Sequence, residues 1–341
     1  MKKSFIFLAC ILLAGPSLLA QKDGQITLFP WASLNYNPGA AGEQNNTLCF
    51  TVFFRQQYLG IKEPAQSSSD GKTSYNDVSI RDMNVNIEFY SRKIRGAFAL
   101  SIKNDKAAYF NNIDLKLGYA YKLNLGPGKL GIGLQLGMIN QSLDFTKLKP
   151  NEEGDPLLLG KDESYLNMDF HFGLHYKTER WYAGVSALQL LGNKAIGISG
   201  EDNVKPVRTF YAMGGYIWTL PWNPSWNIEP SAIIRTDFGT MNFDLMAIAR
   251  YNGILWGGVS YRLQDAVSIV LGAQPFYNSN NNYLKGLEMG LAYSFTTNKL
   301  GYITRGSSGD IEFVIRYCFD IYRQEVFSGY GSSRSIYKNQ Y

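Results

Sequence analysis

Beyond its first twenty residues, the sequence has no unbroken apolar run that could form a membrane-spanning helix. The longest uncharged stretch, 209–228, is interrupted by Pro221, Asn223 and Pro224. A spanning helix needs about 18 apolar residues without such breaks. If the chain enters a membrane, it must therefore do so as strands, which the high content of Gly, Tyr and Phe suits.

Cysteine, histidine and excess charge are also scarce. Three cysteines and two histidines in 341 residues exclude a disulfide-dense scaffold and leave little material for a transition-metal site. The net charge of +5 is small for this length and is not gathered into one stretch, so nucleic acid is not an expected partner. We expect no cofactor and no metal.

The N-terminus has the layout of a secretory signal peptide. Lys2 and Lys3 precede a short apolar run that Pro16 ends, and Ala20 offers a small residue for cleavage. Leu18 is larger than is usual at the −3 position. The alternative is a lipoprotein signal ending at Cys10, but the apolar run before it is too short. We predict a signal peptide over 1–20, which leaves two cysteines in the exported chain.

Apolar and polar residues alternate with a period of two along most of the chain, which is typical of strands and not of helices. In 168–177, for example, the two faces are Met168, Phe170, Phe172, Leu174 and Tyr176 against Asp169, His171, Gly173, His175 and Lys177. About 14 such segments are long enough for tilted membrane strands. They lie near 47–59, 79–90, 93–104, 109–124, 128–142, 164–177, 180–191, 206–220, 225–237, 241–252, 253–263, 266–273, 286–298 and 310–320.

The sequence thus predicts an all-β protein, a transmembrane antiparallel β-barrel of the outer membrane over 47–320. A soluble β-sandwich also alternates, but so many aromatic-rich strands would overfill one core. The expected connections alternate as well, with tight inner turns such as 91–92, 126–127, 178–179 and 252, and long outer loops at 60–78, 143–163, 192–205 and 299–309. This is the habit of outer-membrane barrels, although the inner connection 274–285 is an exception.

The face assigned to the lumen carries charges of both signs. A selective channel tends to line its constriction with one sign, whereas mixed charges form a salt-bridge network that holds a filled barrel rigid. This favours a structural or docking protein over a conductive porin. The residues are Arg55, Arg95, Lys103, Lys116, Arg235, Arg250 and Arg316 with Asp82, Glu88, Asp114, Asp169, Glu229, Asp244, Glu288 and Glu312.

Candidate catalytic and metal-binding residues are few. On a strand, His171 and His175 lie about 13 Å apart, too far to share one metal, so we interpret both as lumenal polar residues. No Gly-x-Ser-x-Gly motif occurs, and neither histidine has a triad context. The acids of Glu152-Glu153-Gly154-Asp155-Pro156 fall in an expected outer loop, where a solvated turn is favoured over calcium binding. We predict no catalytic residue.

Closing the barrel would make its first and last strands antiparallel neighbours. Cys49 then lies near the start of one strand and Cys318 near the end of the other, so both sit close to the periplasmic rim. Cys49 shares a face with Arg55, and Cys318 shares a face with Arg316, so both thiols point into the lumen. We expect a close pair, either a disulfide, which the periplasm favours, or two free thiols one register step apart.

Several motifs together resemble the PorP/SprF family over nearly the whole exported chain. They are Asp23-Gly24-Gln25, 34–42 with its Asn37-Pro38-Gly39 turn, 55–61, Asp155-Pro156, Pro230-Ser231 with Arg235, Trp256-Gly257-Gly258, Tyr261-Arg262 with Asp265-Ala266, and the strand after Ser307-Ser308. The sequence departs from the family in lacking a proline after Asp23, in having Tyr58 for the usual tryptophan, and in having Ser308-Gly309-Asp310 for the usual Ser-His-Glu. We interpret the motif residues as architectural, with Arg55 pointing into the lumen, and carry over no catalytic residue.

The resemblance implies a non-enzymatic outer-membrane component of a type IX secretion system, a machinery associated with protein secretion, gliding motility and the cell surface. Its expected partners are outer-membrane lipid and either other secretion components (a periplasmic lipoprotein or a peptidoglycan-binding protein) or a secreted surface adhesin. The alternative is a passive porin or small-solute uptake channel. The segment 21–46 is expected in or across the periplasmic mouth as a partial plug, and the tail 321–341 is expected in the periplasm against the partner.

Overall fold

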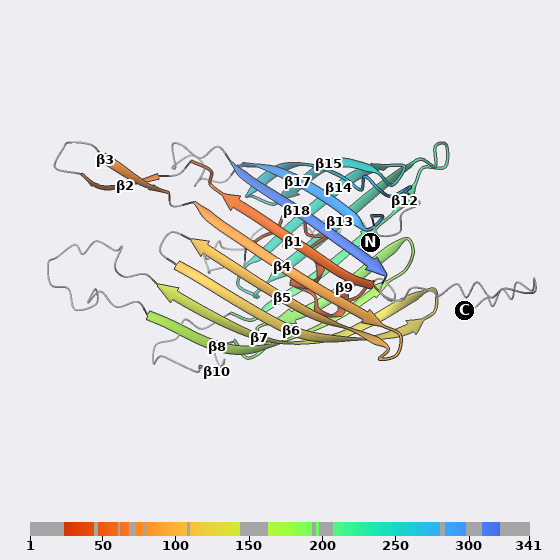
Figure 1. Ribbon diagram of the computed structural model, residues 1–341, viewed down its shortest axis with the longest axis horizontal. Helices are drawn as coiled ribbons and strands as arrows, with labels where there is room; N and C mark the ends of the chain where they lie inside the picture. The colour runs from red at the N-terminus through yellow and green to blue at the C-terminus, as the bar shows by residue number, and fades with distance from the viewer. Residues whose placement is uncertain are drawn as a thin grey trace, which may run out of the picture.

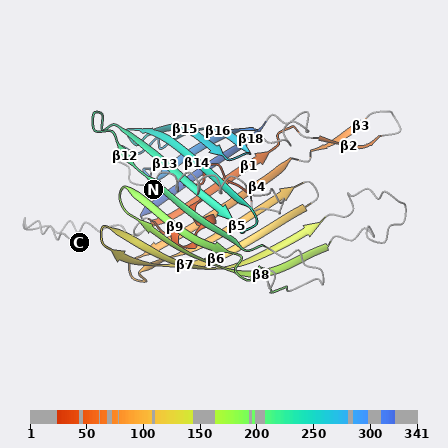
Figure 2. The same cartoon turned by 180° about the vertical axis from the view of Figure 1, so that it is seen from behind.

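The chain forms a closed antiparallel barrel of 14 strands, seen along its wall in Figure 1 and from behind in Figure 2. This computed structural model describes residues 24–43, 47–60, 62–67, 73–77, 79–107, 110–143, 163–192, 196–197, 207–279, 284–297 and 309–320. The barrel strands are β1 (Thr47–Gln57), β4 (Ile80–Ser91), β5 (Gly96–Ala107), β6 (Phe110–Leu125), β7 (Gly128–Leu143), β8 (Glu163–Lys177), β9 (Trp181–Leu188), β11 (Thr209–Tyr216), β13 (Trp226–Thr236), β14 (Met241–Tyr251), β15 (Leu255–Arg262), β16 (Ala266–Ala273), β17 (Leu287–Thr296) and β18 (Asp310–Asp320).

Each barrel strand pairs with its neighbours in sequence, and β18 pairs with β1 to close the ring. Short elements accompany the barrel: the hairpin β2 (Lys62–Ser67) with β3 (Thr73–Asp77), β10 (Ile196–Gly197) on β8, and β12 (Trp218–Thr219) on β13. The helix α2 (Ser33–Tyr36) and the 3-10 turn η1 (Pro38–Ala40) precede the first strand. No helix among the described residues is long and apolar enough to cross a membrane.

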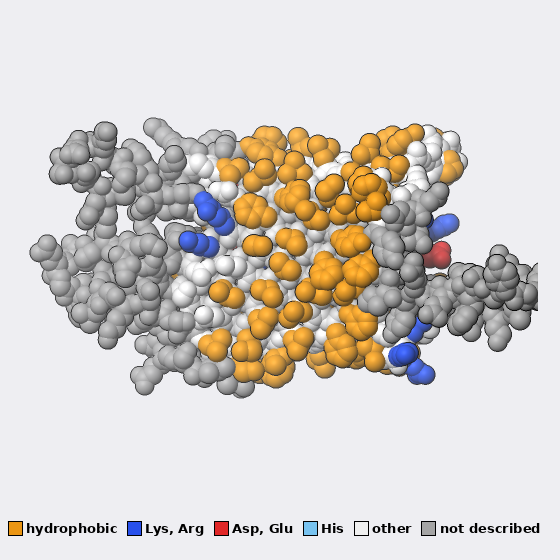
Figure 3. All heavy atoms as spheres, viewed as in Figure 1, with side chains coloured by type: hydrophobic (Ala, Val, Ile, Leu, Met, Phe, Trp, Pro, Cys, Tyr) orange, Lys and Arg blue, Asp and Glu red, His pale blue; other side chains and the backbone are white. Residues whose placement is uncertain are grey.

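The two-residue alternation divides the barrel wall into an apolar outer face and a polar inner face. Leu117 and Leu134 are about 60% exposed on the outside, whereas Arg55 is 2% exposed inside. Figure 3 shows the apolar side chains as a band across the face of the molecule in view. Such a band is what the hydrocarbon core of a bilayer requires. The end of the barrel with short turns is the periplasmic end in outer-membrane barrels.

The 14 predicted strands are confirmed, with two corrections at their ends. The strand predicted at 93–104 is β5, which begins three residues later, because 92–95 forms the turn and Arg95 takes a positive φ of 51° there. The assignment of Arg95 to the lumen is therefore wrong, since its side chain is exposed in that turn. The segment predicted at 206–220 is divided into β11 and β12 around Ile217.

Other predictions fall wholly or partly outside the described residues. The loop predicted at 60–78 contains the hairpin of β2 and β3, which extends away from the barrel beyond its outer end in Figure 1. The acidic stretch 152–156, the signal peptide 1–20 with Cys10, and the tail 321–341 lie outside the residues that the structure describes.

Candidate functional site

Residues 24–43, here called the plug, lie inside the barrel and fill its lumen. Leu28, Phe29 and Ala32 are fully buried there, although they precede the first strand and belong to no sheet. They join a core cluster with lumenal residues of the wall, including Phe53, Tyr211, Trp256 and Val314. The core of this barrel is thus built between the wall and the chain's own N-terminal segment.

The Asn37-Pro38-Gly39 turn of the plug packs against a part of the wall that has no side chains. The Asn37 side chain accepts from Gly39 N (2.8 Å) and donates to Leu174 O of β8 (2.9 Å). The wall beneath is made of glycines, and a Cβ built on any of them would collide with Asn37, Pro38 or Gly39. These glycines are Gly131 and Gly133 of β7, Gly173 of β8 and Gly184 of β9. The motif is therefore more than a turn, because it fits a glycine cradle in the opposite wall.

Aromatic pairs hold the middle of the plug against other strands. Trp31 stacks on Trp256 of β15 with ring centroids 4.4 Å apart, and Tyr36 packs on Tyr211 of β11 at 5.4 Å. The Tyr36 hydroxyl accepts from Ile26 N at 2.9 Å, which folds the plug back on itself. Such pairs add about 0.5–1.5 kcal/mol each beyond the area that they bury.

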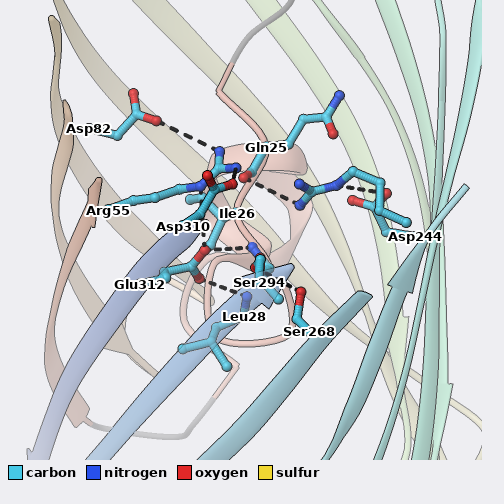
Figure 4. A network of polar contacts seen from close by, with 12 residues as sticks. Gln25, Ile26, Leu28, Arg55, Asp82, Asp244, Ser268, Ser294, Asp310 and Glu312 are labelled. Atoms are coloured by element: carbon cyan, nitrogen blue, oxygen red, sulfur yellow. Dashed lines mark hydrogen bonds and ion pairs between the residues drawn. The ribbon is translucent and has the colours of Figure 1, made fainter. Parts of the chain in front are cut away.

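A carboxylate of the last strand binds the start of the plug. Glu312 accepts hydrogen bonds from Thr27 N and Leu28 N, both at 2.7 Å. Beside it, the buried Arg55 guanidinium lies 3.3 Å from Asp310 and 3.9 Å from Asp82 and Glu312. Figure 4 shows these side chains converging from separate strands on the plug backbone. Hydrogen bonds that involve a charged group are roughly twice as strong as neutral ones, so this cluster fixes the plug firmly.

Two more arginine clusters continue the network around the lumen. Arg262 contacts Asp244 and Asp265, both at 3.3 Å, and donates to the plug carbonyl Gln25 O at 3.4 Å. Arg250 bridges Glu229 (2.8 Å) and Glu288 (2.9 Å). Except for Arg95, the predicted lumenal charges lie on the inner face. The arginine pairs join different strands, whereas Lys103–Asp105 and Lys116–Asp114 pair along a single strand.

The plug ends in a half-buried ionic contact at the periplasmic mouth. Glu43 binds Lys177 and lies 3.7 Å from the His175 ring nitrogen. Burial alone would raise the pKa of the Glu43 carboxyl, but Lys177 and His175 lower it to about 2. Both predicted lumenal histidines are buried: His175 beside Glu43, and His171 with its Nδ1 accepting from Gln189 N at 2.9 Å. Among the described residues, no group of three or more His, Cys, Asp or Glu side chains could hold a metal ion.

The inner face of the wall is closely packed where the structure describes it. Every one of the 14 strands contributes at least one inward side chain that is less than 10% exposed. A small cavity of about 10 Å³ beside Arg55, Asp82 and Glu312 has room for about one water molecule.

Cys49 and Cys318 lie directly opposite each other where β1 and β18 close the barrel, with their Cα atoms 4.1 Å apart, and they form a disulfide. The bond lies at the periplasmic end of this seam. Arg55 links β1 to Asp310 and Glu312 of β18 at the outer end. The seam is thus tied at both ends.

Sequence reasoning located the lumenal charges but missed the cradle and the depth of the plug. A usable signal was present, because Gly131, Gly133 and Gly173 fall on the lumenal face of otherwise regular strands. Side chains missing from the inside of a small barrel leave room that another segment must fill. Motifs that are far apart in sequence, including the Asn-Pro-Gly turn, Arg55, Trp256 and Arg262, all meet around the plug.

Comparison with known proteins identifies a matching family and solved structures with a similar fold. A family model described as type IX secretion system membrane protein PorP/SprF matches residues 18–317. The crystal structure of the toluene transporter TodX of P. putida is similar with a TM-score of 0.50 and 11% identity, covering 84% of this chain and 93% of that one. The monoaromatic hydrocarbon channel CymD gives 0.49 and 13%, covering 85% and 93%. No curated protein matches the sequence significantly. At such identity, the likeness to TodX shows the barrel fold alone.

Proposed function

This chain belongs to the PorP/SprF family of type IX secretion system membrane proteins, and from this premise we propose that it is a plugged barrel that supports export or cell-surface anchoring of secreted proteins. It lies in the outer membrane. Neither its family nor its fold is an enzyme class, and we propose that it has no catalytic activity. The observation that carries the proposal is the filled lumen.

A lumen occupied by the plug favours a scaffolding function over a function as a solute channel. The plug is held by paired backbone hydrogen bonds to Glu312, by the Trp31–Trp256 stack and by the glycine cradle. A solute channel would need an open path bounded by a constriction of suitable charge. The rival function, a passive porin or uptake channel, would therefore require the plug to leave. Its contacts are spread over most of the barrel circumference, which argues against frequent release.

Family membership implies association with other components of the secretion system. We propose that the partner is a periplasmic lipoprotein or peptidoglycan-binding protein of the machinery, or a secreted surface adhesin. A barrel whose lumen is filled can bind such partners through its rims and loops, while its outer wall contacts lipid.

Removing the gene from its native bacterium tests this function. We expect secreted and surface-attached proteins, quantified by mass spectrometry of medium and protease-shaved cells, to fall at least about tenfold for the dependent cargo, and to recover with the wild-type gene. Uptake of small solutes should not change. Unchanged secretion together with slower solute uptake would overturn the proposal in favour of the channel.

A further inference from the structure

Basic side chains that are scattered along the sequence gather on one part of the periplasmic rim. They come from three neighbouring positions in the barrel: the β4–β5 turn, the start of β7 and the β8–β9 turn. We call this set the basic rim: Arg92, Lys93, Arg95, Lys129, Lys177 and Arg180. Figure 3 shows Lys and Arg side chains beyond the apolar band at the right-hand end of the molecule.

The turn between β4 and β5 contributes three cations of the basic rim that have no described charge partner, and like charges meet elsewhere in the rim. Lys129 and Lys177 are direct cross-strand partners, and like charges in that position are destabilising. The described acids near this part of the rim are Glu43, which binds Lys177, the buried Glu88, which accepts from Gly42 N, and the exposed Glu179. Within the described residues, Arg92, Lys93 and Arg95 form no ion pair. The rim therefore presents a positive potential that an anionic partner would relieve.

Two features favour a partner in the periplasm over the membrane. First, Lys129 and Lys177 lie on the lumenal side of their strands: the Lys129 ammonium is 5.8 Å from the ring centroid of the buried Tyr90, and Lys177 contacts the plug. Their charges face the aqueous mouth and not the lipid. Second, six basic residues gather on one part of the rim, while the rest of the described rim carries the exposed Lys285 and the uncharged connection 217–225. A purely lipid-directed belt would be more even.

Another part of the rim carries the features expected of a membrane anchor. The connection between β11 and β13, residues 217–225, contains no charged residue, and Trp222 is 74% exposed. Trp218 and Trp226 lie on the lipid-facing side of the adjoining strands, where outer-membrane barrels place their interfacial aromatics. The two parts of the rim are thus chemically distinct.

We propose that the basic rim is a docking surface for an acidic polypeptide segment of a periplasmic partner. The inference rests on the proposed function in that it names the chemistry of the partner. Electrostatic complementarity speeds association and gives specificity, and binding between exposed charges weakens as salt shortens the Debye length.

The test uses the full exported chain in phosphatidylcholine nanodiscs and, as a probe, a fluorescent peptide rich in Glu and Asp, with anisotropy as the readout. We expect saturable binding that is at least about tenfold weaker in the double variant Arg92→Glu/Lys93→Glu and that falls with added salt. The matched control is Lys106→Glu/Arg208→Glu, which reverses two exposed charges at the outer end and should bind like wild type.

Two outcomes would overturn the proposal. One is equal peptide binding by the two variants. The other is peptide binding that is absent from wild type, while phosphatidylglycerol is retained by wild type and lost from Arg92→Glu/Lys93→Glu, which would assign the rim to lipid. This assay measures peptide binding and not secretion. A negative result would therefore contradict the docking surface only, and the gene deletion would still test the proposed function independently. Gel mobility of each variant with and without heating verifies that its barrel is folded.

Discussion

Replacing both seam cysteines, as Cys49→Ser/Cys318→Ser, should lower the stability of the barrel without preventing its closure. The disulfide joins residues that are 269 positions apart, so it closes almost the whole barrel sequence into one loop. In its absence, β1 and β18 still pair along the seam from Thr47 to Gln56. The Arg55 contacts with Asp310 and Glu312 also remain.

The magnitude follows from the size of the loop. The chain-entropy model, applied to a loop of this length, gives about 5–6 kcal/mol of stabilisation through the unfolded state. Measured values reach about 5 kcal/mol at most, so we expect a loss of about 3–5 kcal/mol. Folded barrel should therefore persist at moderate temperature and unfold well below the wild-type midpoint.

The assay is gel mobility after heating, in which a folded and an unfolded barrel migrate differently. Without reductant, wild type should need a higher temperature for its shift than the double variant, and dithiothreitol should remove the difference. Maleimide labelling of the denatured, unreduced wild type should modify neither cysteine. Full labelling of both thiols, or identical shift temperatures for the two proteins, would refute the seam as described.

Three further outcomes are expected. Gly133→Ala places a methyl group against Pro38 in the glycine cradle and should destabilise the protein by about 1–3 kcal/mol. The control Gly214→Ala, where the nearest atom would be 3.3 Å from the new methyl group, should change the melting temperature little. Equal melting temperatures for the two variants would contradict the cradle. Glu43→Gln should destabilise the protein at pH 7, because a carboxyl with a pKa of about 2 contributes stability above its ordinary pKa near 4.5 that is lost as the pH falls toward 2. The urea midpoint of the variant should therefore lie below that of wild type at pH 7 and equal it near pH 2. The control Glu179→Gln should have the wild-type midpoint at either pH. Removing 321–341 should leave the barrel in the membrane but weaken secretion or anchoring, and wild-type secretion by the truncated chain would remove the role of the tail.

The barrel itself could be predicted from the sequence because a membrane wall imposes a strict two-residue rule. Each residue must face either hydrocarbon or lumen. The polarity of Leu117 and Lys116 therefore predicts which face each occupies, without knowledge of any distant contact. The errors lie where that rule stops. Parity alone places Arg95 in the lumen, but the chain turns at 92–95 before β5 begins, and parity has no meaning in a turn.

The plug could not be placed in the same way. Its residues have no periodicity, because helix α2, turn η1 and extended pieces are stabilised by contacts with the wall and not by a repeating pattern. From the sequence, Glu312 is predicted only as a further lumenal acid. The fold shows that its carboxylate accepts hydrogen bonds from Thr27 N and Leu28 N. Long-range pairings of this kind depend on a register between segments that are nearly 300 residues apart.

The central claim, that the N-terminal segment fills the lumen of an outer-membrane barrel, is tested most directly by conductance in planar bilayers. The purified exported chain should show no steady conductance, while a variant lacking residues 24–43 should show open, long-lived channels. A chain shortened by a similar length at its other end, 321–341, should be as silent as wild type. Steady conductance from the intact chain, equal to that of the variant without the plug, would contradict the account.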